Sequence, residues 1–444
     1  MIRRNGPHFV LSLVLIFSLS ITVWLCVTPA KVNGFAAQGT FPLAGAITQQ
    51  KVVALDGVAK TGFGHSAAIS DDGSTALIGT YYIEFGISYP IGPGKVYAFI
   101  KNDDTWSFQQ QLPTPYMPDA DLFGFSVALS ADGNTALVGA QGGTGPAETQ
   151  VPGAAYVFVR ENGTWEQQAV LTAADRQVGD HFGVSVALSD NGNTALVGAY
   201  VDDVGTNLNQ GSAYIFKRSG VNWSQQAQLT ALDGAEEDYF GRSVSLAADG
   251  ATALIGADFK KIGDNIRQGA AYVFTGNEGA WSQQARITAQ DGSPYNWFGF
   301  SVGLSSDGRT ALVGAEGYGA AFVFTLSGNT WSQQAVLNAE GITFFWGVPV
   351  ALSPDGHTAL IEDGYLFQYI DGDWQAGPNL QPEDSGTSSS GFGSSVALSK
   401  DGSLALVGAK GAKIGENQSQ GAAYFFSGIS SIRPPAIFLP LIIR

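Results

Sequence analysis

The segment from Phe182 to Ala199, FGVSVALSDNGNTALVGA, contains the pattern that decides the fold. Ser185 to Ser189 alternates as expected of a strand with one buried face. Asp190 to Asn193 has the composition of a tight turn, in which Gly192 supplies the positive φ that a β-carbon resists. Thr194 to Ala199 is apolar at nearly every position, which predicts a second strand covered on both faces.

The next residues complete a unit of four strands. A long loop, Tyr200 to Gln210, leads to a third strand, Gly211 to Phe216. A short turn at Ser219-Gly220 then leads to a fourth strand, Trp223 to Leu229. Small residues in the inner strands and aromatic residues farther out are typical of a propeller blade, whose inner strands crowd the axis.

The unit recurs seven times, with a period of roughly 60 residues that shortens late in the chain. Its first element is at Phe63-Gly64, Phe123-Gly124, Phe182-Gly183, Phe240-Gly241, Phe298-Gly299, Trp346-Gly347 and Phe392-Gly393. A single unit cannot bury both its faces, so the repeats predict one closed ring rather than separate domains. The 58 glycines among 444 residues fit many short strands and tight turns.

The last unit lacks its fourth strand, because no tryptophan-led segment follows Phe426. Ile47 to Leu55, before the first Phe-Gly pair, carries Gln49-Gln50 in the position that Gln-Gln pairs hold after most of the tryptophans. We therefore predict an all-β, seven-bladed β-propeller of four-stranded antiparallel blades, closed by an N-terminal strand that completes the last blade. Such closure leaves no open sheet edge.

The termini suggest export. Residues 1–36 have the charged start, the apolar stretch and the small residues of a cleavable signal peptide, although an uncleaved anchor is the alternative. Residues 37–428 form the predicted propeller. Residues 429–444 are a proline-containing apolar tail, either packed on the ring or used for sorting or docking. The only cysteine, Cys26, lies in the signal segment, so disulfides and thiol catalysis are excluded from the mature domain.

The repeated Phe-Gly and Val-Gly-Ala pairs resemble the FG-GAP repeat of integrin α-subunit N-terminal propellers and bacterial secreted repeat proteins. The resemblance covers roughly residues 44–427. It implies a seven-bladed propeller and an extracellular adhesion or ligand-binding role. We expect the protein to be secreted or at the cell surface and to be a monomer.

Many repeats of that family bind calcium in the first hairpin, but the ligand pattern does not carry over. Each turn here keeps one carboxylate and a hydroxyl, fewer than the six to eight oxygens that calcium takes. We interpret the aspartates as turn formers and expect no metal or cofactor; they are Asp72, Asp132, Asp249, Asp307, Asp355 and Asp401.

Other chemistry is poorly represented. A net charge of −16 disfavours nucleic acid as a partner. Gly299 to Gly303 matches the Gly-x-Ser-x-Gly nucleophile pattern, but that pattern needs a strand–turn–helix elbow, and Ser301 opens a strand instead. His65, His181 and His357 are isolated, without the spacing of metal ligands.

Topology nevertheless distinguishes one face of the ring. The loop between the second and third strands lies on the same side as the link to the next blade. Loops of varied sequence therefore gather on one face: 81–93, 141–152, 200–210, 258–268 and 410–420. The candidate ligand-binding residues, all in the links between blades, are Asp121, Asp180, His181, Asp238, Tyr239 and Trp297.

Acids beside exposed aromatic rings suit a glycan or a basic peptide. The alternative is that the loops are ordinary solvated loops, with Tyr239 and Trp297 packed between blades. We predict a non-enzymatic module that binds a protein or glycan through this face. Two other functions stay open: an extracellular carbohydrate-active enzyme that uses paired carboxylates on the same face, and a purely structural surface module.

The closure hypothesis makes a first prediction. Deleting residues 37–57 should destabilise the whole ring, because the last blade would lose its outer strand. Thermal unfolding of the deletion variant checks this, and an unchanged melting temperature would contradict it.

Overall fold

The computed structural model describes residues 47–81, 94–113, 122–143, 151–277, 279–338, 348–384 and 391–429. All of them belong to one compact unit of the chain, Leu43–Arg444. The predicted signal peptide, Trp346-Gly347, Asp121 and all of the tail after residue 429 lie outside the described residues.

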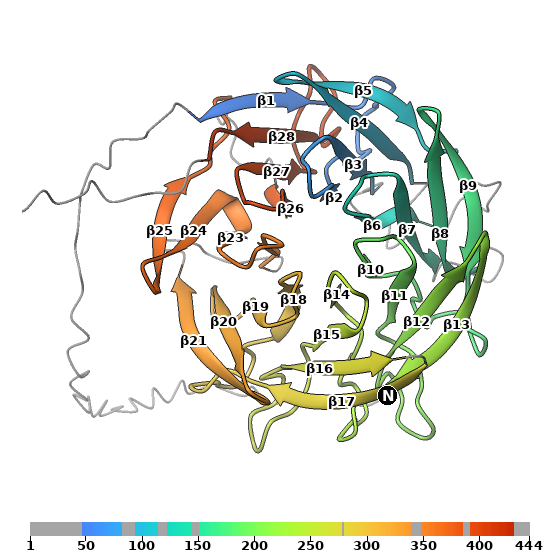
Figure 1. The fold of residues 1–444 in the computed structure, drawn as a ribbon, viewed down its shortest axis with the longest axis vertical. Helices are drawn as coiled ribbons and strands as arrows, with labels where there is room; N and C mark the ends of the chain where they lie inside the picture. Colours follow the sequence, from blue (N-terminus) through green and yellow to red (C-terminus); the bar gives the residue numbers. More distant parts are fainter. Residues whose placement is uncertain are drawn as a thin grey trace, which may run out of the picture. The chain divides into compact units, whose positions relative to one another are not determined.

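Within these described residues, twenty-eight β-strands form seven four-stranded antiparallel sheets arranged around a ring (Figure 1). The predicted all-β, seven-bladed propeller is confirmed. The one helical element among the described residues is the short 3₁₀ turn η2 (Glu362–Gly364). In this part of the chain, no helix has the length and apolar character needed to cross a bilayer.

The first four blades take their strands in chain order, from the innermost to the outermost. Blade 1 consists of β2 (Ser66–Ile69), β3 (Thr75–Gly79), β4 (Val96–Asn102) and β5 (Thr105–Gln111). Blade 2 consists of β6 (Phe123–Leu129), β7 (Thr135–Gly143), β8 (Val151–Glu161) and β9 (Thr164–Leu171). Blade 3 consists of β10 (Val186–Leu188), β11 (Thr194–Ala199), β12 (Ser212–Ser219) and β13 (Asn222–Leu229). Blade 4 consists of β14 (Val244–Leu246), β15 (Thr252–Ala257), β16 (Ala270–Asn277) and β17 (Ala280–Ile287).

Blades 5 and 6 follow the same order, and blade 7 takes its outermost strand from the N-terminal end. Blade 5 consists of β18 (Phe298–Leu304), β19 (Thr310–Ala315), β20 (Ala320–Ser327) and β21 (Thr330–Asn338). Blade 6 consists of β22 (Val350–Leu352), β23 (Thr358–Ile361), β24 (Tyr365–Ile370) and β25 (Asp373–Asn379). Blade 7 consists of β26 (Phe392–Leu398), β27 (Leu404–Ala409), β28 (Ala422–Ser427) and β1 (Thr48–Val52).

Strand β1 has the contacts of an outer strand. It pairs antiparallel with β28, with Gln50 opposite Phe425. The Gln50 side chain also exchanges two hydrogen bonds with the backbone of Trp106 in blade 1, at 2.6 and 2.7 Å. Gln110 of blade 1 makes the same exchange with Trp165 of blade 2, at 3.1 and 2.9 Å. The glutamine pairs therefore join the outer strand of one blade to that of the next.

The Phe-Gly pairs are the joints between neighbouring blades. Phe240 is fully buried and packs against Leu196, Ala213 and Ile215 of the preceding blade. The following Gly241 has a φ of 93°, and a Cβ there would overlap the carbonyl oxygen of Ser212 in blade 3. Glycine is needed because the two backbones approach so closely.

A serine hydroxyl holds five of the joints in place. Ser185 Oγ of blade 3 donates to the carbonyl of Gly241 in blade 4 at 3.0 Å. Four other junctions repeat this bond, at 2.8 to 2.9 Å: Ser66 to Gly124, Ser126 to Gly183, Ser243 to Gly299, and Ser395 to Gly64. Ser301, in the nucleophile-like segment, lies in β18 of blade 5 and accepts the Val350 backbone N–H of blade 6 at 3.1 Å.

The turns between the first two strands of each blade form a second belt around the axis. Their backbone N–H groups donate to the next blade's turn in a closed circuit, at 2.8 to 3.2 Å. The acceptors, in order, are the carbonyls of Ala131, Asp190, Ala248, Ser306, Pro354, Lys400 and Asp71. Since a proline has no N–H to donate, Asp355 donates in place of Pro354.

The aspartates of these turns bond within their own turns. Asp72 Oδ1 accepts the Ser70 hydroxyl at 2.6 Å and the Ser74 backbone N–H at 2.9 Å. Asp132, Asp307, Asp355 and Asp401 each make the equivalent pair of bonds, and Asp249 accepts from the Ala251 N–H at 2.8 Å. Among the described residues, no group of three or more histidine, cysteine, aspartate or glutamate side chains is placed to hold a metal ion.

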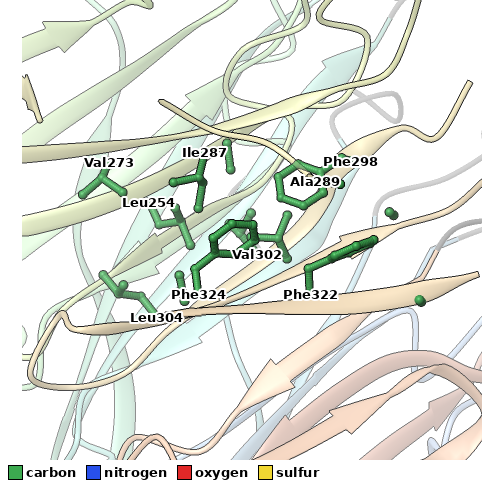
Figure 2. Packing of buried hydrophobic residues seen from close by; sticks show 14 of the residues in the cluster. Leu254, Val273, Ile287, Ala289, Phe298, Val302, Leu304, Phe322 and Phe324 are labelled. Atoms are coloured by element: carbon green, nitrogen blue, oxygen red, sulfur yellow. The ribbon is translucent and has the colours of Figure 1, made fainter. Parts of the chain in front are cut away.

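The hydrophobic core is divided into clusters between neighbouring blades. Figure 2 shows the cluster between blades 4 and 5, where Leu254, Val273 and Ile287 face Phe298 and Phe324. Burying a side chain of this size contributes roughly 1.5–3 kcal/mol. Each blade therefore depends on its neighbours for much of its stability.

We predict that Gly241→Ala is far more destabilising than Gly163→Ala. Gly163 also has a positive φ, 82°, but its missing Cβ points into open space. Gly163→Ala should cost about 1 kcal/mol from backbone strain alone. Gly241→Ala should cost about 3 kcal/mol or more, because its Cβ also meets the backbone of blade 3. Urea unfolding measures both, and equal losses would show that close approach is not the constraint.

Candidate functional site

The two faces of the ring are built from different segments. In each blade, the turns that join the first strand to the second and the third strand to the fourth lie on one face, here called the turn face. This face carries the circuit of backbone hydrogen bonds. The opposite face, here called the loop face, carries the second-to-third strand loops and the links between blades.

A cavity of about 490 Å³ opens on the turn face between blades 1 and 7. The residues that line it include Asp71, Lys101 and Lys400.

Three of the loops that we predict to vary in sequence share the same local conformation. In blades 3, 4 and 7 the loop forms a small antiparallel bridge, at Val204–Asn207, Ile262–Asn265 and Ile414–Asn417. In each, the asparagine side chain donates to a glutamine Oε1 three residues later, at 2.7 to 2.8 Å. These three loops therefore share one shape although their sequences differ, because an asparagine–glutamine contact fixes it.

Two predicted site residues, Asp180 and Asp238, are buried within their own links. Asp180 Oδ2 accepts the Gln177 N–H at 2.5 Å, and Asp238 Oδ2 accepts the Ala235 N–H at 2.7 Å. Asp238 also pairs with the buried Lys260 ammonium at 2.7 Å. Burial raises the pKa of Asp180 to about 6. These carboxylates hold the links, and ligand contact by them stays a prediction.

Two of the predicted ring-bearing residues, His181 and Tyr239, both contact Tyr200, which the sequence analysis did not name as a site residue. Tyr200 stacks on His181, with ring centroids 5.2 Å apart, and meets Tyr239 edge-on at 5.4 Å. Tyr239 also packs on Phe259 at 4.6 Å. Trp297 packs near Tyr295, and its buried Nε1 has no hydrogen-bond partner. Asp121 lies outside the described residues.

Arg242, two residues after Phe240, lies at the centre of this group. Its guanidinium is 5.0 Å from the ring of Tyr200 and 5.0 Å from the ring of Phe300. Asp258 lies beside it, with Oδ2 3.9 Å from Arg242 Nε. These contacts join blades 3, 4 and 5, because Tyr200 follows β11, Arg242 precedes β14 and Phe300 lies in β18.

Asp258 is an unusual carboxylate. It is 1% exposed, and its Oδ1 has no hydrogen-bond partner. Burial raises the pKa of Asp258 to about 6, although Arg242 acts to lower it. A buried polar atom without a partner costs about 1–3 kcal/mol, so such an atom usually indicates a ligand, an ion or a water.

A second group lies at the ends of blades 6, 7, 1 and 2. The His65 ring stacks on Tyr81 at 4.7 Å and packs on Phe125 at 4.8 Å. Burial, assisted by the charge of Lys410, lowers the pKa of His65 to about 3, so the imidazole is neutral. Glu362 is largely buried with an unpartnered Oε2, and burial raises its pKa to about 8.

The two groups occupy equivalent points of the repeat. Charges also influence pKa values from one group to the other: Tyr81 raises the pKa of Tyr200, and Glu316 raises the pKa values of Asp258 and Glu362. These residues follow either a Phe-Gly pair or the end of a second strand, the two points at which the chain reaches the loop face beside the innermost strands. We call them the axial cluster: His65, Tyr81, Tyr200, Arg242, Asp258, Glu362 and Lys410.

Sequence reasoning missed most of the axial cluster. It searched the loops and links for acids and aromatic residues, whereas the cluster occupies two fixed positions of the repeat. Comparing those positions across the units would have found both basic residues. Arg242 stands where other units have histidine, phenylalanine, valine or serine, and Lys410 stands where other units have tyrosine, glutamine or an acid.

The comparisons with known proteins agree with the fold. The FG-GAP repeat family model matches residues 106–158, 165–216, 223–274, 281–324 and 379–426, and the chain belongs to that family. Among curated proteins, none matches the chain. A solved structure of the Pseudomonas aeruginosa periplasmic gluconolactonase, PpgL, is similar with a TM-score of 0.51 and 20% identity, over 76% of this chain and 89% of that one. At this identity the similarity concerns the fold alone.

Asp258 gives a pH-dependent prediction. Its folded-state pKa of about 6 exceeds the ordinary value of 3.8, so the folded protein holds the proton more tightly than the unfolded chain. The free energy of unfolding should therefore fall as the pH rises from about 4 to 6. The Asp258→Asn variant has no carboxyl group at this position, so its free energy of unfolding should not fall in this way.

The stability of Asp258→Asn relative to wild type should increase by on the order of 2 kcal/mol between pH 4 and pH 7. Thermal or urea unfolding across that range measures the difference. Asp264→Asn, at an exposed loop tip, is the control. A difference between variant and wild type that does not change with pH would contradict the prediction.

Proposed function

We propose that this FG-GAP propeller binds a carbohydrate at the axial cluster, as a protein that is secreted or held at the cell surface and is monomeric. The observation that carries the proposal is Arg242, placed between the rings of Tyr200 and Phe300 beside the unpartnered oxygen of Asp258. Sugars present apolar C–H faces and hydroxyl groups, and sites for such ligands combine aromatic walls with a few fixed polar groups.

The size of the cluster favours a glycan over a folded protein partner. A stable protein interface buries about 800 Å² per partner and uses some 20–30 residues. The axial cluster is far smaller, and three of the loops around it have the same conformation. The net charge of −16 disfavours strongly anionic ligands, so a neutral sugar is the best match.

A carbohydrate-active enzyme is the second candidate. Carboxyl groups with raised pKa values, such as Glu362 and Asp258, occur often in active sites. The structural neighbour PpgL is named a gluconolactonase, which at 20% identity supports the fold and gives only a compound to test. Hydrolysis of gluconolactone above its uncatalysed rate would favour this alternative; the expectation of a non-enzymatic protein stays a prediction.

A binding screen tests the proposal. Residues 37–444 would be applied to a glycan array, and hits measured by calorimetry with calcium and with chelator. We expect binding that does not depend on calcium, and a loss of tenfold or more, about 1.4 kcal/mol, in Arg242→Gln. Arg218→Gln is the matched control, because Arg218 lies on the outer hairpin of blade 3 and donates to the Gly220 carbonyl at 3.0 Å.

Equal binding by both arginine variants would remove the axial cluster from the proposal. Binding in a parallel screen of extracellular proteins, without any glycan hit, would favour a protein ligand instead. Binding or a melting temperature that collapses with chelator would show that the Asp-Gly turns, or the longer loops, hold calcium.

A further inference from the structure

The cavity between blades 1 and 7 lies where the ring closes, because blade 7 combines β26 to β28 with the N-terminal strand β1. It is on the turn face, opposite the axial cluster. Its volume of about 490 Å³ is within the range of roughly 300–1,000 Å³ that is usual for small-molecule sites. The residues that line it come from the turns of both blades and include Asp72, Lys101, Asp401 and Leu404.

The joint between blades 1 and 2 shows what fills the corresponding place in the repeat. There, Arg160 Nη2 donates to Thr75 Oγ1 of blade 1 at 3.0 Å, and Arg160 Nε donates to Asn134 Oδ1 of blade 2 at 3.0 Å. The guanidinium also lies over the ring of Trp165, 5.3 Å from its centroid. An arginine of the chain itself therefore fills this joint and bridges the turns of the two blades.

Lys101 is the residue of blade 1 that corresponds to Arg160. The Arg160 N–H donates to the Asn134 carbonyl at 2.8 Å, and the Lys101 N–H donates to the Ser74 carbonyl, at the same point of the turn, at 2.9 Å. Leu404 begins the second strand of blade 7, the position that a threonine holds in blade 1, and it has no hydroxyl group to accept a hydrogen bond. The closing joint therefore has neither the guanidinium nor its acceptor in the preceding blade.

A buried tryptophan shows the same difference between the two joints. Trp165 Nε1 donates to Gln109 Oε1 of blade 1 at 3.1 Å, whereas the corresponding Trp106 Nε1 is buried and has no hydrogen-bond partner. Trp106 is opposite Lys101 in the β4–β5 hairpin. Polar contacts that complete the joint between blades 1 and 2 are therefore missing at the closing joint, and the space is left as a cavity.

The charge of the lining favours a cation. Four aspartates and two lysines line the cavity, which gives a formal charge of −2: Asp71, Asp72, Asp103, Asp401, Lys101 and Lys400. Lys400 Nζ already pairs with Asp71 Oδ2 at 3.2 Å. A guanidinium has five N–H donors in a planar fork and keeps its charge, so it can serve several carboxylates at once.

We propose that the cavity between blades 1 and 7 binds a guanidinium group, as the joint between blades 1 and 2 binds that of Arg160. Asp72, Asp103 and Asp401 supply the carboxylates that accept its N–H groups. The ligands of this site are arginine side chains and small guanidino compounds. The site lies on the turn face, so it is separate from the proposed carbohydrate site.

Two sources carry this chemistry. One is a guanidino compound or an arginine from outside the chain. The other is Arg433, which lies outside the described residues. Ile429 donates its N–H to the Ser403 carbonyl at 3.2 Å, and Ser403 lines the cavity. Four residues of extended chain span at most about 14 Å, so Arg433 is close enough in sequence to reach the cavity.

Calorimetry with agmatine, a guanidino alkylamine, tests the proposal. The matched control ligand is 1,5-diaminopentane, which has the same charge but no guanidinium. Both would be titrated into residues 37–444 and into the same protein with Arg433→Gln. We expect agmatine to bind Arg433→Gln at least tenfold more tightly than 1,5-diaminopentane does. No preference for agmatine in either protein would overturn the proposal.

The two proteins also distinguish the sources. Agmatine binding that is at least tenfold weaker in wild type than in Arg433→Gln would support the proposal with Arg433 as the resident ligand. Equal binding by both proteins would support it with a guanidinium from outside the chain.

Asp401→Asn, made together with Arg433→Gln, tests the site itself. Asn191 forms the same turn in blade 3, where its Oδ1 accepts the Asn193 N–H at 2.9 Å, so the turn should keep its shape and the melting temperature should stay near that of Arg433→Gln alone. Agmatine binding should weaken fivefold or more. Asp307→Asn, in the same turn of blade 5, is the matched control. Equal agmatine binding by the two asparagine variants would overturn the proposal.

Lys101→Arg provides a second variant, which keeps the charge of the cavity and places a guanidinium of the chain in it. Agmatine binding should weaken at least tenfold, whereas Lys413→Arg, on the loop face, should leave it unchanged. Undiminished binding in Lys101→Arg would overturn the proposal. Arg242→Gln should bind agmatine like wild type, so a failure of carbohydrate binding and a failure of this inference are distinguishable.

Discussion

The close approach of each Phe-Gly backbone to the middle strands of the preceding blade is the contact on which the ring depends. At Gly241 a side chain would overlap the Ser212 carbonyl, and the Ser185 hydroxyl fixes the Gly241 carbonyl from the same side. The outer glutamine–tryptophan bonds and the inner backbone circuit add two more belts. The side chains beside each joint are carried to fixed positions at the axial end of the loop face.

The fold was predictable because its determinants are local and repeated seven times. Alternation, Asp-Gly turns and tryptophan-led strands are all read within one unit, and Gln49-Gln50 marked the strand that pairs with β28. The site was less predictable. Arg242 and Tyr200 meet only because neighbouring blades are set at a particular angle, which no single unit encodes. The shared loop shape depends on an asparagine–glutamine contact, such as Asn207 to Gln210, that looked like ordinary polar loop sequence.

The axial cluster works against the stability of the fold. Asp258 and Glu362 each bury a polar oxygen without a partner, and a buried carboxylate is costly unless it is paired or protonated. An uncharged side chain such as Tyr200, which holds the position of Asp258 in blade 3, would avoid this cost. The ring can hold these groups because three belts of hydrogen bonds fix its backbone independently of them.

The segments that match the family repeat show where the chain departs from the common pattern. Each matched segment, such as 106–158, begins at the outer strand of one blade and ends in the third strand of the next. One repeat is therefore a joint between two blades rather than a blade. The matches leave out residues 325–378, which contain Glu362 and the 3₁₀ turn η2. Trp374 still donates to Gln334 at 3.3 Å, so the outer belt continues across this gap. The family pattern is therefore not matched around Glu362, while the hydrogen bond between the outer strands of blades 5 and 6 is kept.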